Sequence, residues 1–315
     1  MLCEIFTVGT IGDIYRFVLI WAFVHISAAD LLLLKPSTGG MVQERATRGR
    51  NMGDVGGGIG LPTMSQREMF EQLLGDDESR SASESEIAAA IGEQMIHMDL
   101  RPLPRSIRKR IRDIVGRIPA RNVIIVGGGI GHLTAWMMDL WCGDPSNEES
   151  VGSNRPETLR VIEEGGKFGV IIDRLLRRYD ASSWAQVISD SWAEIAAEIV
   201  SWNAASAALP DVARSTPLPQ PIDLVIIDLP EVERIQATAS AFELLAPGGI
   251  VMALEPQVPT GDVGEPELGV EMTSAQQVVA SFNQWIEFVQ SVNSAHSAAF
   301  VELAGGTLGV FLRSA

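Results

Sequence analysis

Two groups of residues in this chain have the types and spacing to support chemistry: a cluster of glycines and a set of single carboxylates. The glycines form the stretch VGGGIG at 126–131, directly after an apolar run. The backbone N–H groups of such a turn can face a ligand when a strand precedes the turn and a helix follows it. The same GGGIG sequence occurs at 56–60, but no apolar run precedes it and Pro62 follows soon after. That copy is therefore interpreted as linker.

Each carboxylate of the second group stands at or just after the end of an apolar run. The four residues are Glu163, Asp190, Asp228 and Glu255. In an open parallel sheet, ligands bind outside the carboxyl ends of the strands. Carboxylates there can accept hydrogen bonds from the hydroxyl and amino groups of a ligand.

From residue 122 onward, apolar runs alternate with helical patterns, which predicts a parallel sheet covered by helices on both faces. We expect strands at 122–126, 159–163, 186–189, 222–228 and 249–254. We expect helices at 131–141, 167–179, 191–204, 232–243 and 273–292. The segment AAFVELAGGTLGVFLR at 298–313 is typical of two strands joined by Gly305 and Gly306. Such a hairpin makes the last strand antiparallel to its neighbour.

Composition bounds the class of protein. The chain has 315 residues, a formal net charge of −16 and two cysteines, Cys3 and Cys142. A strongly acidic chain is not expected to coat nucleic acid, although a local basic patch can still bind it. Two distant cysteines predict neither a disulfide framework nor a zinc cluster, which favours a reducing, cytoplasmic location.

The N-terminus leaves several interpretations open. Residues 17–29 are apolar, and the pattern continues to Leu34 with Asp30 interrupting it. A spanning helix needs roughly 20 apolar residues. A signal peptide, a weak membrane anchor and a start codon further downstream are the alternatives. We divide the chain into a hydrophobic segment with flexible linker at 1–63, a helical extension at 64–121 and the sheet domain at 122–315.

The helical extension contains an acidic and a basic segment. Residues 76–86 are acidic and serine-rich, and we expect them to be solvated; residues 84–98 predict a short helix. The isoleucines at helical spacing are Ile107, Ile111, Ile114 and Ile118. The basic residues among them are Arg105, Arg108, Lys109, Arg110 and Arg112. This pattern predicts a docking helix with a solvated basic face, and the alternative is a contact for RNA or another anionic partner.

The glycine turn is compatible with more than one class of cofactor. In the dinucleotide fingerprint G-x-G-x-x-G, Gly127 and Gly129 fit, but His132 occupies the place of the third glycine. The strand and turn are similar to those of flavin-dependent monooxygenases, which usually begin with this motif. Here the motif begins beyond residue 120. Read as G-x-G-x-G, the glycines are Gly127, Gly129 and Gly131.

Further motifs extend the pattern beyond the turn. They are the sequence LAPGG at 245–249, the strand that ends in Asp228, and the terminal hairpin. Together, over about 122–313, they resemble the class I S-adenosylmethionine-dependent methyltransferases. The resemblance implies an α/β fold with a doubly wound, mostly parallel seven-stranded sheet, an antiparallel last strand and helices on both faces. It also implies S-adenosylmethionine as the cofactor.

The resemblance also assigns cofactor contacts. Glu163, with Glu164 beside it, is expected to hold the ribose hydroxyls. Asp190, with Ser191 or Trp192, is expected to hold the adenine. The turn supplies the remaining contacts, to the methionine and ribose, through Val126, Gly127, Gly128, Gly129 and Gly131.

Methyl transfer also needs a group that takes a proton from the acceptor, and three residues are candidates. By resemblance, Asp228 faces the methyl group and the acceptor. His132 follows the glycine turn, and Glu255 follows the fifth strand. The family usually has an acidic residue two positions before the first glycine, where this chain has Ile125. A cofactor-binding subunit without catalysis is therefore an alternative.

Two branches of the fold are similar to this chain. The catechol-type O-methyltransferases often bind a divalent metal through an Asp at the fourth strand and an Asp-Asn pair near the fifth. Asp228 fits the first position, but Glu255 and Pro256 replace the pair. A complete metal site is therefore not expected, although the two carboxylates could form a partial oxygen site. The polyamine synthases, which transfer aminopropyl groups, normally carry an Asp where this chain has Ile130.

The acceptor stays open between a small molecule and RNA. Residues 255–274 form a long acidic loop after the fifth strand, where it can cover the substrate and select a cationic or polar molecule; a solvated loop is the alternative. A flavin or nicotinamide oxidoreductase that uses the same turn is the competing class of enzyme. A homodimer and a membrane contact are further open expectations.

Overall fold

The computed structural model of this chain describes residues 66–314 except for 82, 148, 210–215, 262 and 265–270. The described residues belong to one compact unit. The apolar run at 17–34, the linker that follows it and the first GGGIG copy lie outside the described residues. Within the described part of the chain, no helix is both long and apolar enough to cross a membrane.

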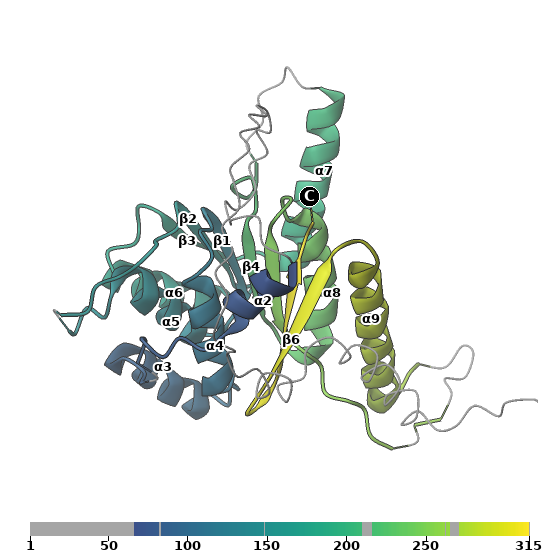
Figure 1. The fold of residues 1–315 in the computed structure, drawn as a ribbon, viewed down its shortest axis with the longest axis horizontal. Helices are drawn as coiled ribbons and strands as arrows, with labels where there is room; N and C mark the ends of the chain where they lie inside the picture. Colours follow the sequence, from purple (N-terminus) through teal and green to yellow (C-terminus); the bar gives the residue numbers. More distant parts are fainter. Residues whose placement is uncertain are drawn as a thin grey trace, which may run out of the picture. The chain divides into compact units, whose positions relative to one another are not determined.

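The described strands form one seven-stranded sheet, which confirms the predicted fold class (Figure 1). The strands are β1 (Asn122–Gly127), β2 (Thr158–Ile162), β3 (Ala185–Ile188), β4 (Leu224–Asp228), β5 (Ile250–Leu254), β6 (Ser297–Leu303) and β7 (Gly306–Leu312). Their order across the sheet is β3-β2-β1-β4-β5-β7-β6. Strands β1 to β5 run parallel, whereas β7 lies antiparallel to both β5 and β6. The predicted hairpin is thereby confirmed.

Helices cover both faces of this sheet (Figure 1). They are α2 (Gln66–Leu74), α3 (Glu86–His97), α4 (Arg105–Val115), α5 (His132–Cys142), α6 (Gly166–Arg178), α7 (Trp192–Ala208), α8 (Glu231–Leu244) and α9 (Ser274–Ala295). Successive residues of β1 point to opposite faces, as a strand requires. Val123 and Ile125 belong to the buried cluster of α2 to α6, and Ile124 and Val126 to that of α7 to α9. Burial on both faces explains why the strands are continuous apolar runs.

The helical extension shares its core with the sheet. Phe70 of α2, Ile87 of α3 and Ile107 of α4 belong to the same buried cluster as Val123 of β1. The docking face predicted from the isoleucine spacing is therefore confirmed. Helix α4 is therefore part of the buried core of the described chain and not a helix on its surface.

Most described residues of the acidic segment 76–86 are exposed, as expected, but two of its carboxylates also pair with α4. Asp76 accepts a hydrogen bond from Arg110 at 2.7 Å, and Glu84 accepts one from Arg108 at 2.6 Å. Lys109 pairs with Asp113 one helical turn later, at 2.7 Å. These cations of α4 are therefore engaged within the chain, and the basic face is not the solvated face that the sequence predicted.

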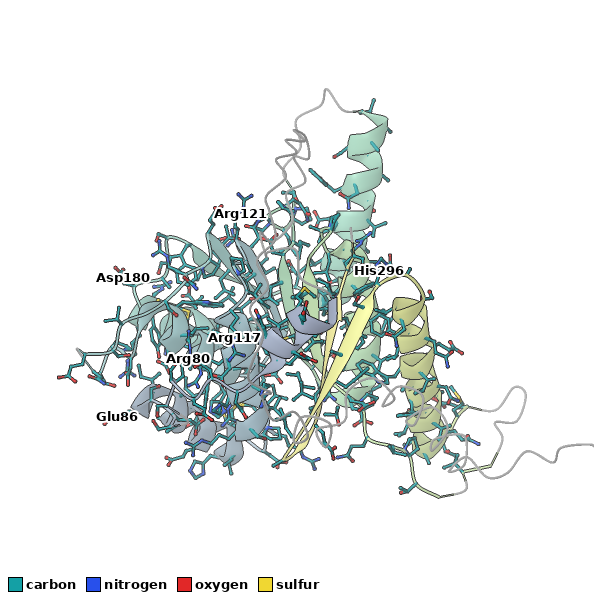
Figure 2. All side chains as sticks on the ribbon, in the orientation of Figure 1. Arg80, Glu86, Arg117, Arg121, Asp180 and His296 are labelled. Atoms are coloured by element: carbon teal, nitrogen blue, oxygen red, sulfur yellow. The ribbon has the colours of Figure 1, made fainter. Side chains whose placement is uncertain are left out.

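Two arginines labelled in Figure 2 hold the loop that follows α2. Arg117 donates hydrogen bonds to the backbone oxygens of Leu73 at 3.0 Å and Gly75 at 2.5 Å. Arg80 donates to Asp77 at 2.8 Å. The loop between α2 and α3 is thus attached to the C-terminal end of α4.

The β6–β7 hairpin reaches the beginning of α4. Leu303 pairs with Gly306, so the loop consists of two residues. The Ser106 hydroxyl donates to the backbone oxygen of Ala304, and a Cβ on Gly305 would lie 2.6 Å from the ring of Pro104. The hairpin tip and the link between α3 and α4 therefore meet at the edge where the parallel strands end.

Candidate functional site

The sheet order reverses between β1 and β4, and open parallel sheets bind ligands outside the carboxyl ends of their strands at such a point. A pocket of about 1380 Å³ lies there. Its walls come from the ends of β1, β2, β4 and β5 with the residues that follow them, and from α7 and α8. The link between α3 and α4 and the hairpin tip complete it.

The glycine turn forms one wall of this pocket through Val126, Gly127, Gly128 and Gly129. Gly127 has a φ of 83°, and a Cβ on it would lie 2.4 Å from the backbone oxygen of Asp228. Side chains rarely adopt that conformation and none fits that distance, so the position requires glycine. The Gly128 N–H donates to the same oxygen at 3.0 Å, which joins the turn to β4.

Gly131 lies at a contact between two helices, and its contact with the cofactor stays a prediction. It precedes the first residue of α5 and is not among the residues that line the pocket. A Cβ on it would lie 3.1 Å from Ile172 and 3.2 Å from Leu175, both on α6. This glycine lets two helices approach each other, as the third glycine of a dinucleotide fingerprint does for helix and strand.

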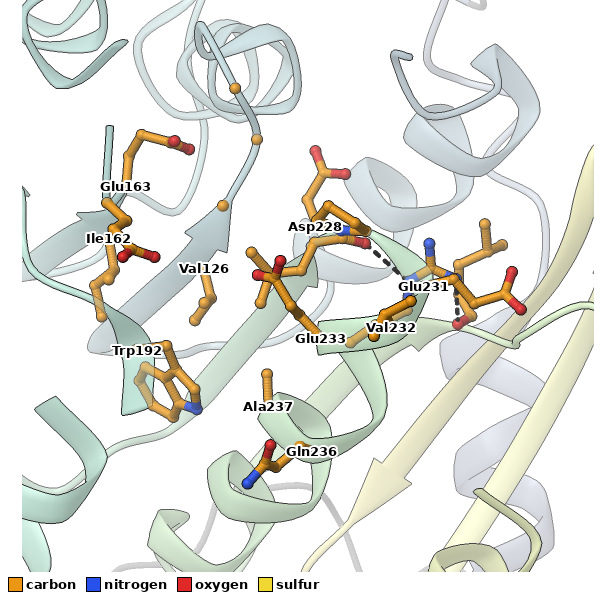
Figure 3. Close-up of a pocket in the computed structure, with 18 of the residues that line it drawn as sticks. Val126, Ile162, Glu163, Trp192, Asp228, Glu231, Val232, Glu233, Gln236 and Ala237 are labelled. Carbon is orange, nitrogen blue, oxygen red and sulfur yellow. Dashed lines mark hydrogen bonds between the residues drawn. The ribbon is translucent and has the colours of Figure 1, made fainter. Parts of the chain in front are cut away.

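Glu163 follows β2, half-buried in the pocket wall beside the glycine turn (Figure 3). Burial raises the pKa of this carboxyl, while hydrogen bonds from the backbone N–H groups of Gly165 and Gly129 oppose the rise. The negative charge of Asp228 raises the pKa further. The structure therefore joins the carboxylate of β2 to the glycine turn of β1, as the sequence predicted.

Asp228 ends β4 and pairs in register with Gly127 of β1. Burial raises the pKa of Asp228 to about 6, against the positive charges of Arg234 and Arg108. One carboxylate oxygen lies 3.5 Å from the place that a Cβ on Gly128 would occupy. A carboxyl with a pKa near neutrality, inside a pocket, can act as a general base.

The structure brings two of the three residues at the start of α7 to the pocket. Trp192 is buried, lines the pocket and donates to the Ser240 hydroxyl at 2.8 Å (Figure 3). Ser191 also lines it, but its hydroxyl caps α7 and donates to Glu194 at 2.9 Å. Asp190 is exposed and is not among the lining residues. Its contact with the adenine stays a prediction.

Glu164 and Glu255 both line the pocket. Glu164 is exposed, whereas Glu255 is partly buried at the end of β5. Burial raises the pKa of Glu255, and the nearby donor groups of Trp285 and Thr307 oppose the rise. Gln257 is the one residue of the loop after β5 that joins Glu255 among the described lining residues.

Helix α8 supplies the wall opposite Glu163. Figure 3 shows Glu231 on the other side of Asp228 from Glu163, with Glu233 and Gln236 on the same helix. Arg234 donates to the backbone oxygens of Leu229 at 3.1 Å and Leu254 at 3.2 Å. It thereby connects the ends of β4 and β5. The sequence analysis did not single out this arginine, although it follows the predicted fourth strand by only six residues.

His132 is not at the pocket, which corrects its place among the candidate bases. It is absent from the lining residues, and its Nε2 lies 2.9 Å from Oε1 of Glu84. A Cβ on Gly92 of α3 would lie 2.6 Å from the ring. Burial, with the positive charge of Arg108, lowers the pKa of His132, and Glu84 opposes this. The histidine is a packing residue at the start of a helix.

Sequence analysis missed the part of the site that comes from the helical extension. Met95 and residues 99–104 line the pocket, next to the glycine turn. Glu84 and Arg108 form an ion pair close to it. Glu84 lies 48 residues before His132 in the chain, so no local pattern could indicate that the two side chains meet.

Across the residues that the structure describes, no three His, Cys, Asp or Glu side chains form a group that could hold a metal ion. Asp228 and Glu255 line one pocket, but they have no third such partner in this part of the chain.

No protein-family model matches the chain, and no curated protein matches it. Among solved structures, the O-methyltransferase from Bacillus cereus in complex with SAH is similar at 14% identity and a TM-score of 0.48, over 78% of this chain and 96% of that chain. The O-methyltransferase TomG from Streptomyces achromogenes in complex with SAM is similar at 17% and 0.48, over 80% and 100%. A methyltransferase from Geobacter sulfurreducens is similar at 13% and 0.46, over 82% and 100%. The functional assignment rests on the pocket itself.

Proposed function

We propose that this chain is an S-adenosylmethionine-dependent methyltransferase whose cofactor binds in the pocket at the β1–β4 junction. The observation that carries this proposal is the glycine turn and Glu163 in the wall of one pocket, at the carboxyl ends of two adjacent strands. A Cβ on Gly128 or Gly129 would reach its nearest neighbours at van der Waals distance, 3.5 or 3.4 Å, and the backbone of both glycines lines the pocket. Backbone on one side and a carboxylate on the other fit a ribose.

The strand order supports a methyltransferase over a flavin or nicotinamide oxidoreductase. The dinucleotide fold has the order 3-2-1-4-5-6. This sheet follows that order as far as β5 and then inserts the antiparallel β7 before β6. His132, where the fingerprint has its third glycine, faces α3 instead of packing on the strand. Both departures separate this chain from the dinucleotide pattern.

When bound, S-adenosylmethionine supplies a methyl group that its sulfonium has already activated. The residues of the pocket orient the acceptor, exclude water and receive its proton. We assign the proton to a carboxylate oxygen of Asp228, because burial raises the pKa of Asp228 to about 6 and leaves most of it ionised at pH 7. Glu255, on the neighbouring strand end, is the second candidate.

We propose a neutral or cationic small molecule as the acceptor. Among the described residues that line the pocket, eight carry carboxylates and two carry guanidinium groups. One of the two, Arg234, already donates to two backbone oxygens. An excess of negative charge in a pocket repels phosphorylated ligands, including RNA and coenzyme A esters, and concentrates cations.

We also propose a cytoplasmic location. Its support is the low cysteine content, with Cys142 present as a free, half-buried thiol. Free thiols persist where the compartment is reducing.

Calorimetric titration with S-adenosylhomocysteine tests the assignment. Glu163→Gln should weaken binding by about 10- to 100-fold, because hydrogen bonds to a charged carboxylate contribute about 1.5–3 kcal/mol. The matched control is Glu157→Gln, since Glu157 stands at the opposite end of the same strand, 66% exposed and 3.8 Å from Arg121. The control should bind as tightly as the parent.

Three outcomes would contradict parts of this proposal. A folded parent that binds no S-adenosylhomocysteine would remove the methyltransferase assignment. Equal losses in Glu163→Gln and Glu157→Gln would remove the role of Glu163. Tighter binding of decarboxylated S-adenosylmethionine than of S-adenosylmethionine would favour aminopropyl transfer instead.

A further inference from the structure

The link between α3 and α4 lies against the glycine turn of the pocket. A Cβ on Gly129 would lie 3.4 Å from the side chain of Met95 and 3.5 Å from that of Leu100. Both residues line the pocket, and so do Asp99 and Arg101 on either side of Leu100. The residue that contacts the turn thus stands between a carboxylate and a guanidinium, and the proposed function has so far used neither.

The backbone at the end of α3 holds this part of the link in place. The Leu100 N–H donates to the backbone oxygen of Met95 at 2.9 Å, and the Asp99 N–H donates to that of Ile96 at 3.1 Å. This pair of hydrogen bonds is the Schellman motif, which has a left-handed residue just after the helix. Asp99 is that residue, with a φ of 57°. The motif turns the chain back at Asp99 and thereby brings Leu100 to the glycine turn.

The two charged side chains of the link are exposed and have no partner within the described part of the protein. No described residue forms a hydrogen bond or an ion pair with the side chain of Asp99 or Arg101. The other guanidinium among the described lining residues, that of Arg234, donates to two backbone oxygens. Of these two cations, Arg101 is therefore the one that can bind an anion without giving up a hydrogen bond inside the protein.

The proposed cofactor has one end that matches this pair of charges. S-adenosylmethionine ends in an α-amino acid, whose ammonium and carboxylate groups are attached to the same carbon atom. The Cα atoms of Asp99 and Arg101 can be at most about 7 Å apart, because only one residue separates them. Two oppositely charged side chains so close together can reach both groups of one amino acid. A carboxylate accepts hydrogen bonds from an ammonium, and a guanidinium donates them to a carboxylate.

We propose that Asp99 and Arg101 bind the amino-acid end of S-adenosylmethionine: Asp99 accepts hydrogen bonds from its ammonium, and Arg101 donates them to its carboxylate. The inference rests on the proposed function and adds the choice of cofactor to it. Because Arg101 binds the carboxylate, it selects S-adenosylmethionine over the decarboxylated form that aminopropyl transfer uses. The helical extension thereby determines which of the two cofactors the pocket prefers.

Calorimetric titrations of the full chain with two pairs of ligands test the two roles. S-adenosylhomocysteine and 5′-methylthioadenosine both have no net charge, but only the first has the amino-acid end. Asp99→Asn should weaken binding of S-adenosylhomocysteine about 3- to 10-fold, a modest factor because the charges of the pair are exposed, and should leave 5′-methylthioadenosine unchanged. Arg101→Gln should weaken S-adenosylmethionine by a similar factor and should not weaken its decarboxylated form. The weaker ligands are measured by competition with S-adenosylhomocysteine.

Each variant has a matched control among residues that do not line the pocket. Asp180 is exposed and ends α6 in the same motif, with a φ of 52° and with N–H donation from Asp180 to Arg177 and from Ala181 to Leu176, both at 3.0 Å (Figure 2). Asp180→Asn makes the same change in the same backbone conformation, which asparagine tolerates as aspartate does. Arg121→Gln removes a 61% exposed cation at the opposite end of β1 from the pocket. Both controls should bind all four ligands as the parent does.

Losses confined to the ligand that carries the recognised group would support the proposal. Equal losses for S-adenosylhomocysteine and 5′-methylthioadenosine in Asp99→Asn would overturn the role of Asp99, because such a change alters the pocket as a whole. Equal losses for S-adenosylmethionine and its decarboxylated form in Arg101→Gln would overturn the selection. A folded parent that binds none of the four ligands would contradict the proposed function itself. A parent that binds them, with both variants unchanged, would contradict this inference alone.

Discussion

At the residue scale, the pocket combines backbone that has no side chain with carboxylates that are partly buried. Gly127 permits β1 and β4 to approach, and Gly128 and Gly129 expose backbone to the pocket. Glu163 and Asp228 stand on either side of that turn (Figure 3). Burial raises the pKa of both carboxyls. Their ionised forms are therefore unfavourable in the free protein, and a positively charged ligand would stabilise them.

Gly127→Ala should lower the free energy of unfolding by about 2 kcal/mol or more. The left-handed conformation alone costs an L-residue about 1–2 kcal/mol, and the Cβ would also stand 2.4 Å from a backbone oxygen. Urea denaturation measures the change. Gly166→Ala is the control, because no described atom lies within 4 Å of its Cβ and the residue begins α6. The control should leave stability unchanged or raise it by at most about 1 kcal/mol. Similar losses in both variants would contradict the argument.

At the element scale, the two faces of α4 make different contacts. Its isoleucines pack into the core beneath β1 and α5, and its cations hold the acidic segment that precedes α3. The link from α3 to α4 then forms part of the pocket wall. The helical extension is thus both a structural part of the sheet's core and a part of the candidate site.

Ile107→Ala tests whether α4 is part of the common core. The side chain is fully buried, and removing such a group costs about 2–5 kcal/mol. We expect one unfolding transition at a lower urea concentration, with circular dichroism and tryptophan fluorescence coincident. Ile96→Ala, in α3 and 68% exposed, should change stability by less than about 0.5 kcal/mol. Separate transitions for the two probes would show an extension that folds independently.

At the scale of the whole molecule, the net charge of the chain and the charge of the pocket have the same sign. The chain carries a formal net charge of −16, and carboxylates outnumber guanidinium groups among the described lining residues by eight to two. The field of the protein therefore adds to the field of the pocket and attracts cations. S-adenosylmethionine carries one more positive charge than S-adenosylhomocysteine, which provides a direct measure of this field.

Raising the salt concentration from about 0.01 to 1 M should weaken binding of S-adenosylmethionine more than binding of S-adenosylhomocysteine. The screening length falls from about 30 to 3 Å over that range, which removes long-range attraction and leaves contacts intact. The ratio of the two dissociation constants, measured by calorimetry, gives the effect without interference from general salt effects. Equal salt dependence for the two ligands would mean that the pocket's negative charge is compensated locally.

Much of the fold could be predicted because it depends on local patterns. Apolar runs at 122–126 and 222–228 and the repeated isoleucines of α4 carry their periodicity in consecutive residues, which is why the strands and this docking helix were found. The carboxylates Glu163 and Asp228 could be placed at the pocket because parallel strands end at one edge. A residue's position could be predicted wherever it depends only on one element and the direction of that element.

Other positions depended on how distant elements pack. Asp190 follows a strand as Glu163 does, yet it is exposed where Glu163 is half-buried, because only packing decides which side a loop residue faces. His132 was directed to α3 by Glu84, and that contact exists only once the helical extension docks. The sequence by itself determined the strands and the glycine turn, since these follow from residue type and period. The tertiary structure alone decided which charged groups meet around Asp228, because their elements lie far apart in the chain.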